Sequence, residues 1–232
     1  MATEPLAFPP APDGDPWGET PLEELPIIAF DTETGGLDPR KDPLLTVGLA
    51  CPDGPVLVAT VHHERYQPKA AVLDINRITT RWAEHGSPWP LIEGLVRDQL
   101  DGRVVLGHNV GFDLRFLITN APDLSLPAAI DTAAVARFLW PGEKATLRDV
   151  CGRYGIEVEG AHGAGADAWA ASRAWIYLRA ALSHRGIDTW NKLCAARAPI
   201  PARMDRRPWP DEVAAAIEAA GQRGVDVGSA AV

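Results

Sequence analysis

The spacing of hydrophobic and polar residues predicts regular secondary structure from about residue 26 onward. Three apolar runs, at residues 27–30, 44–50 and 56–61, predict a meander of three strands. Residues 88–100 carry apolar positions at helical spacing, and they lead into the apolar run 104–106, which predicts a fourth strand. This part of the chain therefore contributes most of a sheet and one long helix.

Beyond residue 106 the pattern becomes mainly helical. It predicts a short helix through residues 114–118, a short fifth strand at 129–130, and helices at about 131–139 and 146–154. A glycine-rich loop then precedes an alanine-rich helix at about 166–182. Strands first, followed by strands that alternate with helices, predict an α/β fold with a mixed sheet flanked by helices.

The two ends of the chain differ from this central part. Residues 1–25 contain six prolines and six acidic residues without any Lys or Arg, so we expect a disordered leader. We place the folded domain at residues 26–185. Residues 186–232 are expected to form a C-terminal extension, with a stretch rich in Pro and Arg at 199–210 and a short helix at 211–220.

The overall composition fits a soluble globular protein. With 232 residues and 46% hydrophobic content, the chain can fill the core of one domain. It contains neither an apolar run long enough to cross a membrane nor a secretory signal, so we expect a cytoplasmic protein that does not contact membranes. Three cysteines far apart in the sequence predict neither disulfides nor a zinc site.

The net charge of −9 does not by itself suggest binding to nucleic acid, because phosphates attract basic surfaces. Two thirds of this charge, however, comes from the six acids of the leader. Once the four acidic residues assigned below to metal binding are set aside, residues 26–232 are close to neutral. The charge therefore neither excludes nor supports a nucleic-acid substrate.

Asp31 and Glu33 are the first candidate site residues. They stand two positions apart at the end of the first predicted strand, and the period of two places both side chains on one face of the sheet. This arrangement offers two carboxylates to one metal ion, although an acidic pair can also simply end a strand. The residues that follow, 34–37, make the pattern more specific.

Two further motifs contain acidic residues and histidines. Residues 108–113 read His-Asn-Val-Gly-Phe-Asp and begin a helix after the fourth strand, which brings Asp113 to the same sheet edge if strands one and four are neighbours. Residues 162–167 read His-Gly-Ala-Gly-Ala-Asp, which places His162 in a loop and Asp167 in the first turns of a helix. Taken alone, Asp113 could be a helix-dipole partner and His162 a solvated side chain.

Taken together, the three motifs resemble the DEDD superfamily of 3′–5′ exonucleases. Within it they are similar to the histidine subgroup, which includes the proofreading subunit of bacterial DNA polymerase III, ribonuclease T and oligoribonuclease. The resemblance spans roughly residues 26–182, and the order, spacing and strand context of the motifs all agree. One departure is the stretch 76–79, Asn-Arg-Ile-Thr, where many proofreading relatives have His-Gly-Ile-Thr.

The resemblance implies a ribonuclease H-like fold with a five-stranded mixed sheet and a two-metal mechanism. Two Mg²⁺ or Mn²⁺ ions, roughly 4 Å apart, would be held by acidic residues, and one histidine would act as general base. The backbone around Thr34 and Gly35 would contact the terminal nucleotide, and Asn109 is a further candidate for substrate binding. The implied metal ligands are Asp31, Glu33, Asp113 and Asp167, and the implied base is His162.

The resemblance also implies a partner, namely a nucleic acid with a free 3′ end. It favours DNA over RNA and leaves open a DNA polymerase or a replication or repair complex as a protein partner. The alternatives are a catalytically silent nucleic-acid-binding or polymerase-docking module, an exoribonuclease that trims RNA, and an endonuclease that uses the same metals. The basic residues Lys144, Arg148 and Arg153 could contact phosphates or form a solvated helix face, and Trp169 and Trp175 are expected in the core.

Overall fold

A mixed sheet of five strands forms the centre of the molecule. The computed structural model describes residues 17–52, 54–124, 128–158 and 162–196. β1 pairs antiparallel with β2 and parallel with β4, while β3 and β5 form the two edges. The order is β3-β2-β1-β4-β5, with bounds β1 (Ile27–Thr34), β2 (Leu44–Ala50), β3 (Val56–Thr60), β4 (Val104–Gly107) and β5 (Ala129–Asp131).

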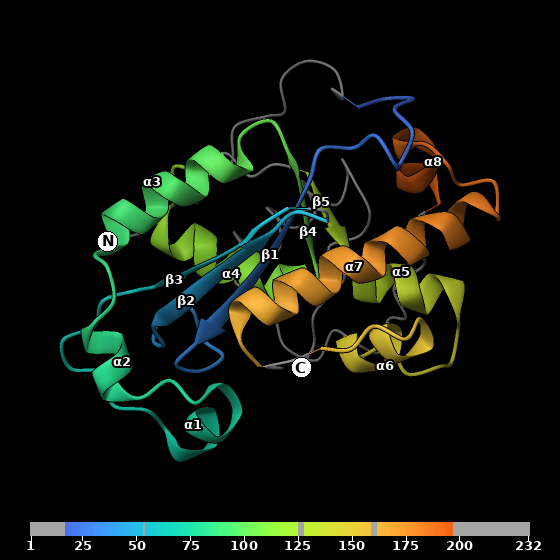
Figure 1. Ribbon diagram of the computed structural model, residues 1–232. Coiled ribbons are helices and arrows are strands. Elements are labelled where there is room, and N and C mark those ends of the chain that lie inside the picture. Colours follow the sequence, from blue (N-terminus) through green and yellow to red (C-terminus); the bar gives the residue numbers. More distant parts are fainter. Residues whose placement is uncertain (1–16, 53, 125–127, 159–161, 197–232) are drawn as a thin grey trace, which may run out of the picture.

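Helices cover both faces of this sheet (Figure 1). The long helix α7 (Ala164–Ser183) crosses one face, with α5 (Thr132–Leu139) and α6 (Leu147–Arg153) packed beside it. The helices α3 (Trp89–Leu100) and α4 (Val110–Asn120) cover the other face. Within the described residues, no helix combines the length and the hydrophobicity needed to cross a lipid bilayer.

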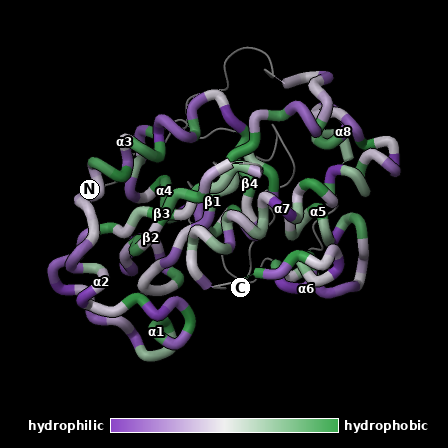
Figure 2. The backbone as a smooth tube through the Cα atoms, viewed as in Figure 1, coloured by the Kyte–Doolittle hydropathy of each residue, from purple (hydrophilic) through white to green (hydrophobic). Residues whose placement is uncertain are grey.

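The alternation of side chains along β1 divides the core into two layers. Ile27 and Ala29 belong to the apolar cluster on the α7 side, whereas Ile28 and Phe30 belong to the cluster on the α3 and α4 side. Figure 2 shows mainly hydrophobic positions in the central strands and an alternation of hydrophobic and hydrophilic positions along α3. Because side chains alternate with a period of two, the next odd positions, 31 and 33, belong to the α7 side.

Two helices between β3 and α3 were not predicted. They are α1 (Ala70–Asn76), with seven residues, and α2 (Thr80–Glu84), with five. A helix of one or two turns shows too few apolar repeats for its period to be recognised in a window of 11 or more residues. Together they cover one end of the sheet beside β1 (Figure 1).

Residues 17–25, which we assigned to the leader, pack together with residues 186–196, which we assigned to the C-terminal extension. Residues 17–25 pack against α8 (Trp190–Ala195), where the rings of Trp17 and Trp190 meet at 5.5 Å between centroids. The amide of Leu22 donates to Asp188 at 2.9 Å, and Leu22 is only 1% exposed. The prolines and charges of residues 1–25 predicted disorder, but Leu22 and Leu25 belong to the core cluster on the α7 side of the sheet, and Trp17 packs against it. The predicted helix 211–220 and the Pro/Arg-rich stretch lie outside the described residues.

The start of α7 lies directly on the backbone of β2. A Cβ atom added to Gly48 would lie 2.1 Å from the carbonyl oxygen of Ala164, and one added to Gly165 would lie 2.3 Å from Cγ2 of Val58. Real Cβ atoms do not approach other atoms so closely, so position 48, which faces backbone atoms, requires glycine, and a side chain at position 165 would have to displace Val58. These two glycines let the first turn of α7 rest on the sheet without intervening side chains.

We therefore expect Gly48→Ala to destabilise the protein and to displace the first turn of α7. The methyl group would meet backbone atoms, which cannot rotate away as a side chain can, and overpacking of this kind typically costs about 1–3 kcal/mol. For a chain of this size, each kcal/mol corresponds to a fall of about 2–4 °C in melting temperature. Thermal unfolding of the purified variant measures this shift.

Gly94→Ala is the matched control, because Gly94 lies within α3 and an added Cβ atom would meet nothing within 4 Å. Alanine favours the helix over glycine by up to about 1 kcal/mol, so this variant should be slightly more stable than the wild type. Equal melting temperatures for the two alanine variants would contradict the proposed close contact at Gly48.

Candidate active site

Asp31 and Glu33 lie next to each other on the α7 side of β1. In the ladder with β2 they stand opposite Gly48 and Thr46, so no large side chain separates them from α7. Both are partly buried, whereas Thr32 between them is 6% exposed and belongs to the opposite face. The strand thus directs two carboxylates into the space beneath the start of α7.

Asp167 joins this pair from the first turn of α7. Its amide donates to the carbonyl oxygen of Gly163 at 3.0 Å, so the residue is part of the regular helix. Carboxylate oxygens of Asp31, Glu33 and Asp167 lie within 4.8 Å of one another. The close approach of α7 to Gly48 is what brings the third acid to the first two.

Asp113 reaches the same region from the opposite layer, as part of the first turn of α4. The parallel ladder between β1 and β4 runs only as far as Ala29 and Leu106, and β1 continues beyond it. The Asp113 carboxylate accepts the next hydrogen bonds from β1, from the amide of Thr32 at 2.8 Å and from its hydroxyl at 2.7 Å. Asp113 therefore has both a structural contact with β1 and a place beside the other acids.

Burial raises the pKa values of all four acids, and the charges of the other cluster members add to this effect at Asp31 and Glu33. Burial raises the pKa of Glu33 to about 8, and the charges of Asp167 and Asp113 add to this effect. Burial also raises the pKa of Asp113 to about 7, against the opposing effect of the hydrogen bonds from Thr32. The pKa of Asp31 lies well above its ordinary value, first through burial and then through its three acidic neighbours.

This cluster fits divalent cations. Four carboxylates that disfavour each other's ionisation would be stabilised by a bound positive charge, and their hard oxygen atoms suit Mg²⁺ or Mn²⁺. The side chains come from a strand and from two helices packed on a common sheet, so their relative positions are fixed by the core. The residues expected to bind metal are thus brought together.

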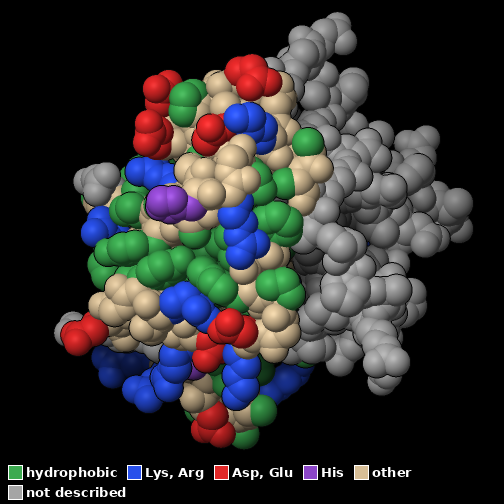
Figure 3. Space-filling model, turned by 90° about the vertical axis from the view of Figure 1, so that its right-hand side faces the viewer, with side chains coloured by type: hydrophobic (Ala, Val, Ile, Leu, Met, Phe, Trp, Pro, Cys, Tyr) green, Lys and Arg blue, Asp and Glu red, His purple; other side chains and the backbone are tan. Residues whose placement is uncertain are grey.

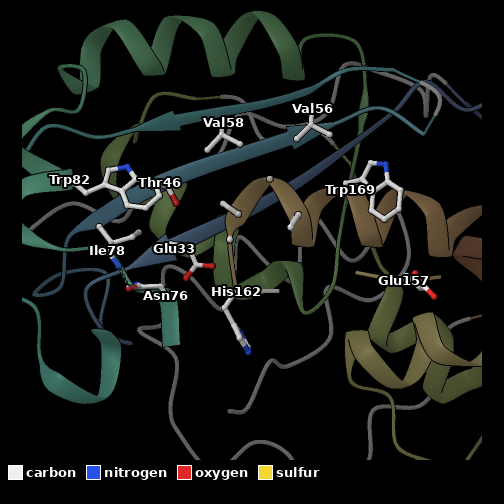
Figure 4. A pocket seen from close by; sticks show the side chains of 14 residues that line it. Glu33, Thr46, Val56, Val58, Asn76, Ile78, Trp82, Glu157, His162 and Trp169 are labelled. Atoms are coloured by element: carbon white, nitrogen blue, oxygen red, sulfur yellow. Dashed lines mark hydrogen bonds between the residues drawn. The ribbon is translucent and has the colours of Figure 1, made fainter. Parts of the chain in front are cut away.

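His162 is exposed and immediately precedes α7. Its φ of 68° lies in the left-handed region, which a non-glycine residue rarely adopts. Burial raises the pKa of Asp167, while the charge of His162 and a hydrogen bond from its backbone lower it. Figure 4 shows the imidazole ring pointing away from Glu33. His162 is therefore beside the acids, and its ring would have to turn in order to face them.

Asn76 is a site residue that the sequence analysis did not identify. It is 8% exposed at the end of α1, and its Nδ2 donates to the carbonyl oxygen of Thr34 at 3.2 Å. A hydrogen bond from its side chain lowers the pKa of Glu33, and its Oδ1 accepts from the amide of Ile78 at 3.0 Å (Figure 4). The only signal in the sequence was that this residue begins the stretch that departs from the relatives.

Thr34 and Gly35, expected near the terminal nucleotide, are packed into the fold. The Thr34 hydroxyl donates to the carbonyl oxygen of Gly36 at 2.6 Å, and a Cβ atom on Gly35 would lie 2.5 Å from Cδ of Pro43. Leu37, at the end of the same turn, is 49% exposed. Asn109 is half-buried at the start of α4. The contacts of these residues with a substrate stay predictions.

A largely apolar groove of about 760 Å³ begins at Glu33 and runs between β3 and the start of α7 (Figure 4). Val58 and Trp82 are 55% and 53% exposed, which is unusual for large apolar side chains. Trp169, which we expected in the core, packs against the core on the α7 side and also lines the groove, whereas Trp175 is fully buried as predicted. The acids therefore adjoin a surface that can take up flat apolar groups.

The basic residues near α6 differ from one another in their contacts. Arg153 forms an ion pair with Glu143, and its guanidinium lies 4.2 Å from the ring centroid of Trp140. Figure 3, which shows the side where α5, α6 and α8 lie in Figure 1, has Lys and Arg side chains around an apolar area. Lys144, in the segment before α6, and Arg148, within α6, are exposed. For Arg153, the contacts favour a structural role.

Comparison with known proteins gives consistent similarities. Residues 28–174 match the sequence family described as Exonuclease. The DNA polymerase III subunit epsilon of Rickettsia felis is 30% identical over 173 residues, and the alignment covers 68% of this chain and 75% of that protein.

Solved structures share the fold at lower identity. E. coli exonuclease I in complex with a dT13 oligonucleotide superposes with a TM-score of 0.60 and 18% identity, covering 69% of this chain and 42% of the exonuclease. S. pombe Pop2p in its Mg²⁺- and Mn²⁺-bound form gives a TM-score of 0.58 and 14% identity, covering 68% and 84%. These similarities confirm the resemblance drawn from the three motifs and the ribonuclease H-like fold with its five-stranded mixed sheet.

The raised pKa values predict how the stability of the metal-free protein depends on pH. An acid whose pKa is higher in the folded than in the unfolded state binds more protons when folded, so stability falls as pH rises between the two values. For Glu33 this window runs from about 4.5 to about 8. In EDTA, we expect the melting temperature to fall by at least about 2–4 °C between pH 5.5 and pH 8.

Glu33→Gln should flatten this dependence and raise the melting temperature at pH 8, because a neutral amide is not repelled by its neighbours. Glu84→Gln, on the exposed surface of α2, is the matched control and should behave as the wild type does. A wild-type protein whose stability in EDTA is constant or rises over this range would contradict the repulsion among the four acids.

Proposed function

This chain belongs to the exonuclease family, and we propose that it hydrolyses DNA from the 3′ end with divalent cations and a histidine base. The observation that carries the proposal is the convergence of carboxylates from β1 and α7, with oxygen atoms within 4.8 Å of one another. Asp113 adds a fourth carboxylate from α4. A catalytically silent binding module would have no use for four clustered acids that repel one another.

Asp31, Glu33, Asp113 and Asp167 are the residues that would hold the metal. Two Mg²⁺ or Mn²⁺ ions bound to them would supply the Lewis-acid chemistry that phosphodiester hydrolysis needs at the attacking and leaving oxygens. The carboxylates would determine where the positive charge is held, because β1 and the first turns of α4 and α7 pack together. Asn76 orients Glu33 through its side-chain amide.

His162 is the proposed general base, which takes the proton of the attacking water. Its place directly before α7, in the segment that leads into the helical turn of Asp167, supports this role. The exposed side chain can turn about its own torsions, so the imidazole can face the acids when a nucleic acid fills the site. No rearrangement of the sheet is needed for this movement.

The groove beside Glu33 supports unpaired nucleotides as the substrate. Exposed tryptophan and valine side chains offer faces on which bases can stack, and stacking contributes about 1–3 kcal/mol per base. The relatives support DNA, since one is a subunit of DNA polymerase III and another was solved with a dT13 oligonucleotide. We extend the proposal to a replicative DNA polymerase as a protein partner, and to substrate contacts from Thr34, Gly35 and Asn109.

The test uses 5′-labelled DNA and RNA oligonucleotides, each single-stranded, fully paired or mismatched at the 3′ end. With Mg²⁺ we expect a ladder of products shortened one nucleotide at a time from the 3′ end, fastest for single-stranded and mismatched DNA. Excess EDTA or Asp31→Asn should abolish the ladder, while the variant stays folded because it loses repulsion rather than packing. Internal cuts, unchanged hydrolysis in EDTA, or turnover of RNA alone would refute the corresponding part of the proposal.

His162→Ala should reduce the turnover number and leave binding intact. All four carboxylates remain in this variant, whereas the water loses its proton acceptor, and general-base catalysis typically contributes about 10²- to 10⁴-fold. We expect kcat to fall by that factor with little change in the affinity for DNA or metal. His184→Ala, at the far end of α7, is the matched control and should retain wild-type turnover. Near-normal kcat in His162→Ala would assign the base to another group.

A further inference from the structure

A fifth acidic residue, Asp131, lies near the candidate active site without belonging to the metal-binding cluster. It ends β5, it is completely buried, and none of the roles described above uses it. Its charge acts on Asp113, whose pKa it raises. A buried carboxylate is costly unless it is hydrogen-bonded, so its contacts indicate what it stabilises.

One carboxylate oxygen of Asp131 connects the start of α5 with the residue that precedes α4. Its Oδ1 accepts from the amide of Ala133 at 2.9 Å, which caps the start of α5, and from the amide of Asn109 at 2.9 Å, directly before α4. Thr132 connects the same two segments. Its hydroxyl lies 3.0 Å from Nδ1 of His108 and donates to the carbonyl oxygen of Gly107 at 3.0 Å. The loop from β4 to α4 is therefore tied to the start of α5.

The link holds Asn109 in an unusual conformation. Asn109 has φ 59° and ψ 41°, in the left-handed region, and its side chain does not cap the helix that it precedes. A non-glycine residue keeps a strained backbone of this kind only where the surrounding structure holds it there. Here Asp131 holds the amide of Asn109, and Arg137 donates to its Oδ1 at 3.0 Å. The direction in which α4 begins is thus set from α5.

The same turn of α4 carries Asp113, four residues after Asn109. Asp113 is fixed at its other side by the two hydrogen bonds from Thr32. We propose that Asp131 is a positioning residue, which holds the start of α4 so that Asp113 faces the other three acids at the distance that metal binding requires. This inference rests on the proposed metal site and assigns no direct contact between Asp131 and the metal or the nucleic acid.

Two substitutions distinguish a positioning role of Asp131 from a role of its charge. The second oxygen, Oδ2, is buried and has no hydrogen-bond partner among the described residues. In Asp131→Asn, the amide oxygen can keep both bonds that Oδ1 accepts, while the NH₂ group takes the place of Oδ2. In Asp131→Ala, both bonds are lost. The asparagine variant should therefore rescue the function if position is what matters.

The experiment measures Mn²⁺ binding to the full-length protein by electron paramagnetic resonance, together with thermal stability and the Mg²⁺ concentration for half-maximal exonuclease activity. Loss of a residue that orients a metal ligand typically costs about 10- to 100-fold in metal affinity or activity. We expect Asp131→Ala to weaken Mn²⁺ binding by that factor, and Asp131→Asn to stay within about threefold of the wild type.

Val135→Ala is the matched control, because Val135 is buried in α5 and its side chain belongs to the core on the α7 side. It should lower the melting temperature without shifting the Mn²⁺ affinity. Asp131→Ala with reduced stability and unchanged Mn²⁺ affinity would overturn the proposal, as would Asp131→Asn with a loss as large as that of the alanine variant. A wild type that binds Mn²⁺ but degrades no nucleic acid would refute the exonuclease proposal alone, since Mn²⁺ binding is measured without substrate.

Discussion

The backbone contact between β2 and the start of α7 is the constraint on which the candidate site depends. Gly48 and Gly165 permit it, because any side chain at these positions would collide with the opposite element. Without it, Asp167 would stand farther from β1 by at least the thickness of a side chain, and three carboxylates could not gather within 4.8 Å. The site therefore depends on the absence of side chains at Gly48 and Gly165 as well as on the acids.

The acids repel one another, so the fold has to hold them together against their own charge. Burial of the two apolar clusters on either face of the sheet supplies the opposing stability. The acids come from both layers: β1 and α7 contribute three, while α4 contributes Asp113 at the point where β4 ends. Because β1 is longer than its parallel neighbour, Asp113 can take over hydrogen bonds that a longer β4 would have made. The position of this acid therefore follows from strand length.

Most of the sheet and all the proposed metal ligands could be predicted from the sequence, because they depend on local patterns. Strands of alternating or continuous apolar residues have a recognisable period, and the acids stand at the ends of such elements. Asn76 and Asp131 could not be found in this way, since their contacts join segments distant in sequence: 42 residues separate Asn76 from Thr34, and 22 separate Asp131 from Asn109. The packing of residues 17–25 also involves a distant segment. It was missed because the composition of the leader does not show that a few of its apolar side chains are buried.

The proposed base differs from the proposed metal ligands in how it is held, and this difference follows from its task. A metal ligand has to keep a fixed distance, so strands and helix turns carry the four acids. A group that accepts a proton has to meet the water only when substrate is present, and His162 is exposed, precedes a helix and adopts a positive φ. The strained backbone at this residue fixes where the side chain starts, while its exposure leaves the ring free to turn. Rigid acids and an adjustable imidazole would allow the site to assemble fully only around a bound strand.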